Sequence, residues 1–313
     1  MDNEKPLVSV LTLTYNHANF IDEFFDSLLS QTYENWEVII GDDCSTDGTQ
    51  KKLKYYKDKY PSKIKLILNE KNLGITKNAQ NVLNACKGEY ICTIAGDDLL
   101  LPKKLEKQVE IMEKNKNINL CFHDLEVFYD NGNTIRFSQI NKYTPKRGTI
   151  KEMIKYGAFA GACSVMVRRE VIPKKGFDER VPLASDWLFY VESVGDKEFY
   201  YIDEVLGRYR RHTGNVTTNK TIECLNDHIL SCAILLNRYE QYYKEINSRI
   251  SSILFEKAVA YFNMKENSKA VFCLKSSLNT KFNLKSFIVY ISYILGINFD
   301  VLYNLKSFFK KSL

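Results

Sequence analysis

The sequence predicts an α/β fold, in which helices flank a mostly parallel sheet, followed by an all-helical C-terminal extension. In the N-terminal part, short apolar segments alternate with segments whose apolar residues recur at helical spacing. That alternation is typical of a parallel sheet covered by helices on both faces. From about Thr221 onward the apolar residues recur at helical spacing only, so we expect helices alone in that region.

Four apolar segments are expected to form the parallel strands of this sheet. They cover residues 7–14, 36–40, 64–68 and 90–94. Helices are expected between them, one beginning near Ile21 and another running from about Thr76 to Ala85. Right-handed crossovers then place the carboxyl ends of all four strands at the same edge of the sheet.

The pattern changes after residue 98. A helix is expected from Pro102 to about Asn115, and the region that follows contains further strands and one short helix starting at Ser185. The expected strands cover residues 119–129, 134–137 and 164–167. The segment 208–212 closes this mixed part, and we predict two domains, residues 1–217 and residues 218–313.

Composition excludes several classes of protein. The chain has 313 residues, of which 45% are hydrophobic, enough for one large core and a smaller second unit. Its net charge of +6 comes largely from scattered lysines, whereas a nucleic-acid partner would require a clustered basic face. The eight cysteines include no Cys-x-x-Cys pair, so neither a zinc site nor a disulfide framework is indicated, and a reducing cytoplasm is expected.

Polar and acidic side chains follow three of the expected strands. Asp97 and Asp98 come just after the strand at 90–94, Asn16 follows the first strand, and Asp42 and Asp43 follow the second. Because ligands bind at the carboxyl ends of strands in open α/β sheets, these residues define a candidate site. Two neighbouring carboxylates call for a positive partner, and an all-oxygen site favours Mg²⁺ or Mn²⁺. The alternative is that the acid pair simply begins a polar loop.

Six groups of short motifs follow one another along the first two thirds of the chain. They are Ser9-Val10-Leu11-Thr12-Leu13-Thr14-Tyr15-Asn16, Ser30-Gln31-Thr32-Tyr33, Gly41-Asp42-Asp43-Cys44-Ser45-Thr46-Asp47-Gly48-Thr49, Asn72-Leu73-Gly74-Ile75 with Asn78, Gly96-Asp97-Asp98 before Pro102, and Gly176-Phe177-Asp178-Glu179 with Ser185-Asp186-Trp187. In this order and spacing they resemble the motifs of family 2 glycosyltransferases with the GT-A fold. The resemblance covers roughly residues 6–215 and leaves the helical extension outside it.

The resemblance implies a metal-dependent, inverting transferase that moves a sugar from a nucleotide diphosphate donor, most often a UDP-sugar, to an acceptor hydroxyl. Asp186 would be the catalytic base, and Mn²⁺ or Mg²⁺ the cofactor. The implied nucleotide-binding residues are Thr14, Tyr15, Asn16, Asp43, Asn78 and Asp97, and the residues placed at the metal are Asp97, Asp98 and His212.

The chain departs from the family pattern at three positions. Ala95 stands where the family usually has an acid, Ser185 where an acid often precedes the base, and Leu13 where proline is common. These departures leave open a non-catalytic, nucleotide-binding scaffold protein of the same fold. Structural alternatives also remain open for single residues: Asp186 could cap a helix, Asp43 could cap a turn, and 208–212 could be a solvated strand face.

The acceptor implied by the resemblance is a surface polysaccharide, a lipopolysaccharide or a lipid-linked glycan of the bacterial cell envelope. The segment 287–303 is strongly apolar but is interrupted by polar residues and is too short for a transmembrane helix. Followed by Lys306, Lys310 and Lys311, it is expected either to pack as a terminal helix or to lie on a membrane surface. We therefore expect a cytoplasmic protein with peripheral contact to the inner face of the membrane through its C-terminal helices.

Overall fold

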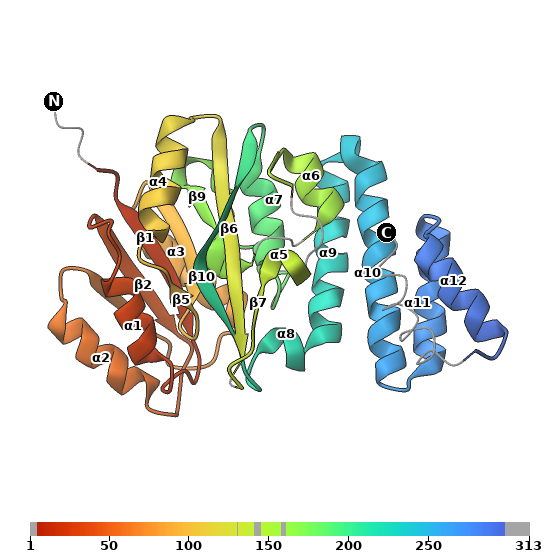
Figure 1. Cartoon of the computed structure of the whole chain (residues 1–313), viewed down its shortest axis with the longest axis horizontal. Helices are drawn as coiled ribbons and strands as arrows, with labels where there is room; N and C mark the ends of the chain where they lie inside the picture. The colour runs from red at the N-terminus through yellow and green to blue at the C-terminus, as the bar shows by residue number, and fades with distance from the viewer. Residues whose placement is uncertain (1–4, 130, 141–144, 158–160, 298–313) are drawn as a thin grey trace. The chain divides into compact units, whose positions relative to one another are not determined.

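The computed structural model describes residues 5–129, 131–140, 145–157 and 161–297 (Figure 1). The chain divides into two compact units, Met1–Asn215 and Val216–Leu313, which are treated separately below. The predicted boundary after residue 217 lies within α8 (Val216–Asn219), the first helix of the second unit.

The first unit is built on one sheet whose N-terminal strands are all parallel. In space the order is β3-β2-β1-β4, so the first strand lies between the second and the fourth. Val8 of β1 is level with Trp36 of β2 and with Tyr90 of β4. These strands are β1 (Val8–Thr14), β2 (Trp36–Asp42), β3 (Ile64–Leu68) and β4 (Tyr90–Ala95).

The later strands extend the same sheet in the order β9-β6-β10-β5. They are β5 (Leu99–Leu100), β6 (Ile118–Tyr129), β7 (Thr134–Arg136), β8 (Arg147–Gly148), β9 (Met166–Arg168) and β10 (Glu198–Arg211). Strand β9 is antiparallel to both β4 and β6, and β10 is parallel to β6. The long strands β6 and β10 therefore run in the direction of β4, and their carboxyl ends reach the same edge.

Seven helices are assigned among the described residues of this unit. They are α1 (Ile21–Leu29), α2 (Thr49–Lys59), α3 (Ile75–Ala85), α4 (Lys104–Lys114), α5 (Phe137–Ile140), α6 (Ile150–Tyr156) and α7 (Asp186–Val194), and two short 3₁₀ turns are η1 (Ala162–Ser164) and η2 (Arg169–Val171). Helix α1 forms because its apolar residues follow the 3.6-residue period and bury one face. A capping box between Thr149 and Glu152 begins α6.

The two faces of the sheet are covered by different helices. Even-numbered residues of β1 and β4, such as Val10 and Cys92, pack in one core with apolar side chains of α1, α2 and α4. Helix α3 lies against β1 and β2, and α7 lies against β6. Because successive strand residues point to opposite faces, this alternation explains why the strands are apolar on both sides.

The second unit is helical throughout its described residues. It contains α8, α9 (Thr221–Arg238), the 3₁₀ turn η3 (Glu240–Tyr242), α10 (Tyr243–Asn263), α11 (Asn267–Thr280) and α12 (Leu284–Ile294). A small core joins α10 and α11 through Phe262, Ala270 and Leu274. None of the helices in the part of the chain that the structure covers combines the length and the apolar character needed to cross a bilayer.

The predicted fold class is confirmed, and the differences are local. The third strand has its predicted bounds, and the fourth extends one residue further, to Ala95. The strand expected at 134–137 ends at Arg136, where α5 begins. The strand expected at 164–167 is shifted, because Ala162–Ser164 forms a 3₁₀ turn before β9.

Gly88, in the turn before β4, provides a test of how closely this sheet is packed. A Cβ at this position would lie 2.5 Å from the backbone nitrogen of Ser9 and 2.7 Å from the carbonyl oxygen of Leu7. Backbone atoms cannot move aside as a flexible side chain can, so Gly88→Ala is expected to lower the free energy of unfolding by about 1–3 kcal/mol.

Urea unfolding measures this loss, and Lys87→Ala is the matched control. Lys87 is the exposed neighbour of Gly88, so its truncation should change stability by no more than about 0.5 kcal/mol. Equal stability of the two variants would contradict the close approach.

Candidate active site

The turn of Gly96, Asp97 and Asp98 that follows β4, called the acid turn below, places Asp97 between two histidines. His212 Nε2 donates to Asp97 Oδ2 at 2.9 Å, and His17 Nε2 lies 3.9 Å from the same oxygen. The N–H of Gly214 donates to His212 Nδ1, so the ring proton of neutral His212 is on Nε2. Burial alone would raise the pKa of Asp97, but the hydrogen bond from His212 and the favourable electrostatic contributions of both imidazoles outweigh it and lower this pKa. Asp97 is therefore held as a carboxylate.

Asp98 has a different environment from its neighbour. Its Oδ1 accepts the backbone N–H of Arg210 at 2.9 Å, and the thiol of Cys163 is also hydrogen-bonded to it. Burial, together with the charge of Asp97, raises the pKa of Asp98 well above the ordinary value. Asp98 thus attaches the end of β10 to the acid turn, while Asp97 carries the negative charge.

Arg210 stabilises the acid turn through a hydrogen bond to its backbone. Its guanidinium donates to the carbonyl oxygen of Asp97 at 2.9 Å and to Glu23 at 2.7 Å. The same group lies over the rings of Phe20 and Phe128, 4.8 and 4.5 Å from their centroids. Arg210 is buried, so this position is not part of a solvated strand face.

Asp43 is bound by the loop after β3. Its two carboxylate oxygens accept the backbone N–H groups of Leu73 and Gly74, at 2.7 and 2.9 Å, and Oδ1 also accepts from Asn69 at 3.0 Å. Asn69 donates in turn to Asn78, whose amide bonds to the backbone of Gly41. The predicted nucleotide-binding residues Asp43 and Asn78 therefore lie in one network. In the turn toward Gly48, which Asp43 could alternatively have capped, the N–H of Ser45 donates to the carboxylate of Asp42.

The loop after β1 is linked to the loop after β2. Thr14 donates from its hydroxyl to Asp42 at 2.9 Å, at the ends of the two strands. Asn16 has a left-handed backbone, with φ of 56°, and its side-chain oxygen accepts the N–H of Thr46 at 2.9 Å. Asparagine tolerates this conformation better than most residues. Tyr15 lies between them with half of its surface exposed, which leaves its ring open to a ligand.

Asp186 is the first residue of α7, and Ser185 occupies the N-cap position. The carboxylate of Asp186 accepts the N–H of Trp187 at 2.9 Å, and burial raises the pKa of Asp186 above its ordinary value. Ser185 shares a hydrogen bond with Thr76 at the start of α3, and Tyr190 bonds to Thr93 of β4. These two bonds fix the start of α7 relative to β4, so the departure from the family pattern at Ser185 has a structural role.

Two residues near the predicted site carry no motif signal. Asn69 connects Asp43 to Asn78 from the end of β3, and an isolated asparagine after a strand does not reveal this role. His17 directly follows the motif that ends in Asn16, but the contact with Asp97 depends on the path of the loop. Its buried Nδ1 is without a hydrogen-bond partner among the described residues.

The donor groups around Asp97 suit a divalent cation only in part. In the regions covered by the structure, no cluster of three or more His, Cys, Asp or Glu side chains is already arranged to hold a metal. An ionised carboxylate with the imidazoles of His212 and His17 is nevertheless a donor set that Mn²⁺ accepts. Asp98 already accepts a hydrogen bond from the backbone N–H of Arg210, and the methyl side chain of Ala95 cannot act as a metal ligand.

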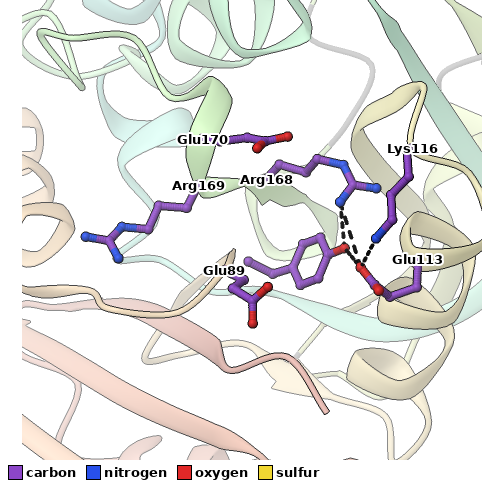
Figure 2. Close-up of a pocket in the computed structure, with 7 residues that line it drawn as sticks. Glu89, Glu113, Lys116, Arg168, Arg169 and Glu170 are labelled. Atoms are coloured by element: carbon purple, nitrogen blue, oxygen red, sulfur yellow. Dashed lines mark hydrogen bonds and ion pairs between the residues drawn. The ribbon is translucent and has the colours of Figure 1, made fainter. Parts of the chain in front are cut away.

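A cavity of about 590 Å³ lies at the opposite end of β4 and is separate from these residues (Figure 2). Four of its lining residues bond to one another: Tyr90 and Lys116 both bond to Glu113, and Arg168 donates to the Tyr90 hydroxyl at 2.7 Å. These bonds stabilise the amino-terminal end of the strand.

Three curated relatives align with about two thirds of this chain or more. An uncharacterized glycosyltransferase of Methanocaldococcus jannaschii is 32% identical over 213 residues, which is 66% of this chain and 71% of the relative. An uncharacterized glycosyltransferase of Haemophilus influenzae is 30% identical and covers 96% of this chain and 95% of its own length. UDP-Glc:alpha-D-GlcNAc-diphosphoundecaprenol beta-1,3-glucosyltransferase WfgD of Escherichia coli is 28% identical over 68% of this chain and 81% of its own. The chain spans only 60% of the length of a matching Mycobacterium bovis protein.

Solved structures share the fold at low sequence identity. TarS 1–349 of S. aureus, in complex with UDP-GlcNAc, has a TM-score of 0.64 at 18% identity and covers 87% of this chain and 81% of its own. The mannosyltransferase PcManGT of Pyrobaculum calidifontis, with GDP-Man and Mn²⁺, has a TM-score of 0.63 at 15% identity over 94% of this chain and 81% of its own. These likenesses concern the fold alone.

The sequence motifs, the parallel sheet with acids at its carboxyl edge and the aligned relatives agree with one another. The sequence model of glycosyl transferase family 2 matches residues 9–174, more than half of the chain. The chain belongs to glycosyl transferase family 2.

Proposed function

We propose that this glycosyltransferase moves a sugar from a UDP-sugar to an acceptor hydroxyl on a cell-envelope polysaccharide or a lipid-linked glycan. The relative WfgD, whose name specifies a UDP-glucose donor and a diphosphoundecaprenol-linked acceptor, supports both halves of this proposal. All eight cysteines are free thiols, which supports a place in the reducing cytoplasm.

The observation that carries the proposal is the ionised Asp97 at the carboxyl edge of the sheet, bonded to His212 and backed by the guanidinium of Arg210. Asp97 and His212 would hold Mn²⁺ or Mg²⁺, with Asp98 keeping the acid turn in place through Arg210. To bind the cation through Nε2, neutral His212 would carry its ring proton on Nδ1 instead, and the hydrogen bond from the Gly214 N–H would be lost. When bound, the cation would neutralise charge on the donor diphosphate.

The nucleotide would lie over the loops that follow β1 and β2. Tyr15 offers an exposed ring, and Thr14 and Asn16 hold the loop beneath it. Asp43 uses three hydrogen bonds within the protein, whereas a carboxylate has about four acceptor sites, so one remains for a base N–H. Asn78 keeps this carboxylate in position through Asn69.

Asp186 would act as the general base. As the acceptor oxygen attacks the anomeric carbon, its proton passes to Asp186, and the bond from that carbon to the diphosphate breaks. A single in-line displacement inverts the anomeric centre. The raised pKa of Asp186 makes it a better proton acceptor than an ordinary aspartate, provided that it is ionised.

Asp97→Ala tests the nucleotide and metal site directly. We expect calorimetry to show UDP binding to the wild-type protein that is stronger with Mn²⁺, and loss of that metal dependence in the variant, because the ionised carboxylate is gone. GDP serves as the comparison ligand. Asp58→Ala, which removes an exposed acid of α2, should bind UDP as the wild type does.

Absence of nucleotide binding in every condition would contradict the proposal. It would instead favour a protein that keeps the fold without catalysis, as the departures at Ala95 and Ser185 allow.

Asp186→Asn separates chemistry from binding. Loss of the base should lower kcat for transfer by roughly 10²–10⁴-fold while the Kd for UDP stays unchanged. Because a buried carboxylate is replaced by a neutral amide, the variant should be at least as stable as the wild type at neutral pH. Asp196→Asn changes an exposed acid just beyond the same helix and is the matched control. Transfer at the wild-type rate by Asp186→Asn would show that another group is the base.

The pH profile of transfer should have an acid limb set by Asp186. Burial raises the pKa of this carboxyl above the ordinary aspartate value of about 3.9, so kcat/KM should fall as the pH drops through that raised pKa. The pKa of Asp97 is lowered, and UDP binding should therefore persist to lower pH than transfer does. Parallel loss of binding and transfer would argue against this assignment of the two carboxylates.

A further inference from the structure

Most of the large apolar residues of helix α12 lie on its exposed side, whereas Val289 and Tyr290 pack against the core of α10 and α11. Ser286 and Ser292 are buried, with 0% and 8% of their surface exposed. Ile288 and Ile294 are 50% and 59% exposed on the same helix. A helix that only completed a core would have the opposite pattern.

Hydrogen bonds hold the helix in this orientation. Ser286 Oγ lies 2.7 Å from Ser277 Oγ of α11, which lies 2.9 Å from Ser251 Oγ of α10. All three hydroxyls are buried. Turning α12 to bury its apolar face would break the bond between Ser286 and Ser277, whereas Ser277 and Ser251 would keep their bonds to each other and to backbone carbonyls. The apolar face is therefore directed outward by the packing of the unit itself.

The outward residues form one continuous stripe, which we call the α12 stripe. Within the helix its members recur three and four positions apart, as one face of a helix requires. They are Leu284, Phe287, Ile288, Ile291, Ile294 and Leu295, all exposed. Contiguous exposed apolar surface of this kind marks an interaction site.

The net positive charge of the chain lies in the part of the sequence that contains this stripe. Residues 267–313 contain seven lysines and a single acid, Asp300, so their net charge equals the +6 of the whole chain. The preceding residues, 1–266, are therefore neutral overall. Lys281 and Lys285 are exposed immediately before and within α12.

We propose that the α12 stripe docks on an anionic lipid surface. An exposed apolar face beside lysines is the pattern of a helix that lies in the membrane interface. Helix α12 has 11 residues, whereas a spanning helix needs about 20, so it would lie along the surface. A second copy of the segment, or the residues that follow α12, carries the same positive charge and is a poorer match. This proposal concerns the second unit and stands independently of the proposed transferase chemistry.

Sedimentation of the full chain with lipid vesicles tests the proposal. Vesicles of phosphatidylglycerol and phosphatidylcholine should bind the protein, and vesicles of phosphatidylcholine alone should bind it much more weakly. Ile288→Gln and Ile294→Gln should each weaken binding roughly tenfold or more, because each removes most of an exposed apolar side chain that would be buried in the lipid. Tyr55→Gln, at an equally exposed aromatic of α2 in the first unit, is the matched control.

The lysines provide an independent measurement. Lys281→Gln and Lys285→Gln should each weaken binding to the anionic vesicles about fivefold, since a lysine near such a surface contributes about 1 kcal/mol. Lys51→Gln and Lys54→Gln, on exposed positions of α2, should leave binding unchanged. Thermal unfolding of each variant shows whether it is folded, which is expected because the substituted side chains are exposed.

Three results would overturn the proposal. The first is that wild-type protein binds neither kind of vesicle, and the second is that the α12 variants bind as the wild type does. The third is a wild-type dimer in light scattering that Ile288→Gln and Ile294→Gln convert to a monomer, which would assign the stripe to a second copy. Transfer to a water-soluble acceptor, measured on the same variants, should be unaffected. Its outcome therefore separates failure of the lipid proposal from failure of the proposed function.

Discussion

The first unit depends on one junction, where the acid turn after β4 meets the end of β10. Asp98 accepts the backbone N–H of Arg210, and Asp97 accepts from His212 two residues further along. The guanidinium of Arg210 returns to the carbonyl of Asp97. Two adjacent acids can be buried here because each has its own partner, and because only Asp97 has a pKa that favours the charged form. The junction thus joins β10 to the turn after β4, and it also supplies the negative charge of Asp97 to the site.

The remaining site residues also have a structural role in addition to their proposed role in the site. Asp43 orders the loop after β3, Asn16 joins two loops, and Asp186 begins a helix whose Tyr190 is bonded to β4. Side chains that are already held by the protein lose little freedom when a ligand binds, which favours precise positioning. It also means that substitution of Asp43 or Asn16 perturbs local structure together with binding. Asp186 is a cleaner probe of chemistry, because its known hydrogen bond is to the adjacent N–H of Trp187.

In the second unit, the packing of the helices depends in part on hydrogen bonds between small polar side chains. Its helices are held partly by buried serine hydroxyls, with Ser277 bonded to both Ser251 and Ser286. Hydrogen bonds between small side chains allow close helix packing in which most large apolar residues of α12 are not buried. Those residues are then free to face outward beside Lys281 and Lys285, where an outside partner can cover them. Composition alone obscures this arrangement, since the lysines of the chain look evenly scattered until their balance with acids is followed along the sequence.

The sequence by itself determined the fold class, the parallel strands and the family, because these depend on local patterns: apolar periodicity, turn residues and short motifs. It also placed Asp43 and Asp97 at one edge, since parallel strands share their carboxyl ends. Only the tertiary structure decided that β10 returns beside β6, in the direction of β4, and so brings His212 to Asp97 across 115 residues of chain. It likewise divided the acid pair into a charged Asp97 and an Asp98 bonded to Arg210, and turned the serines of α12 inward. These outcomes depend on strand order and on long-range hydrogen bonds, which no local pattern encodes.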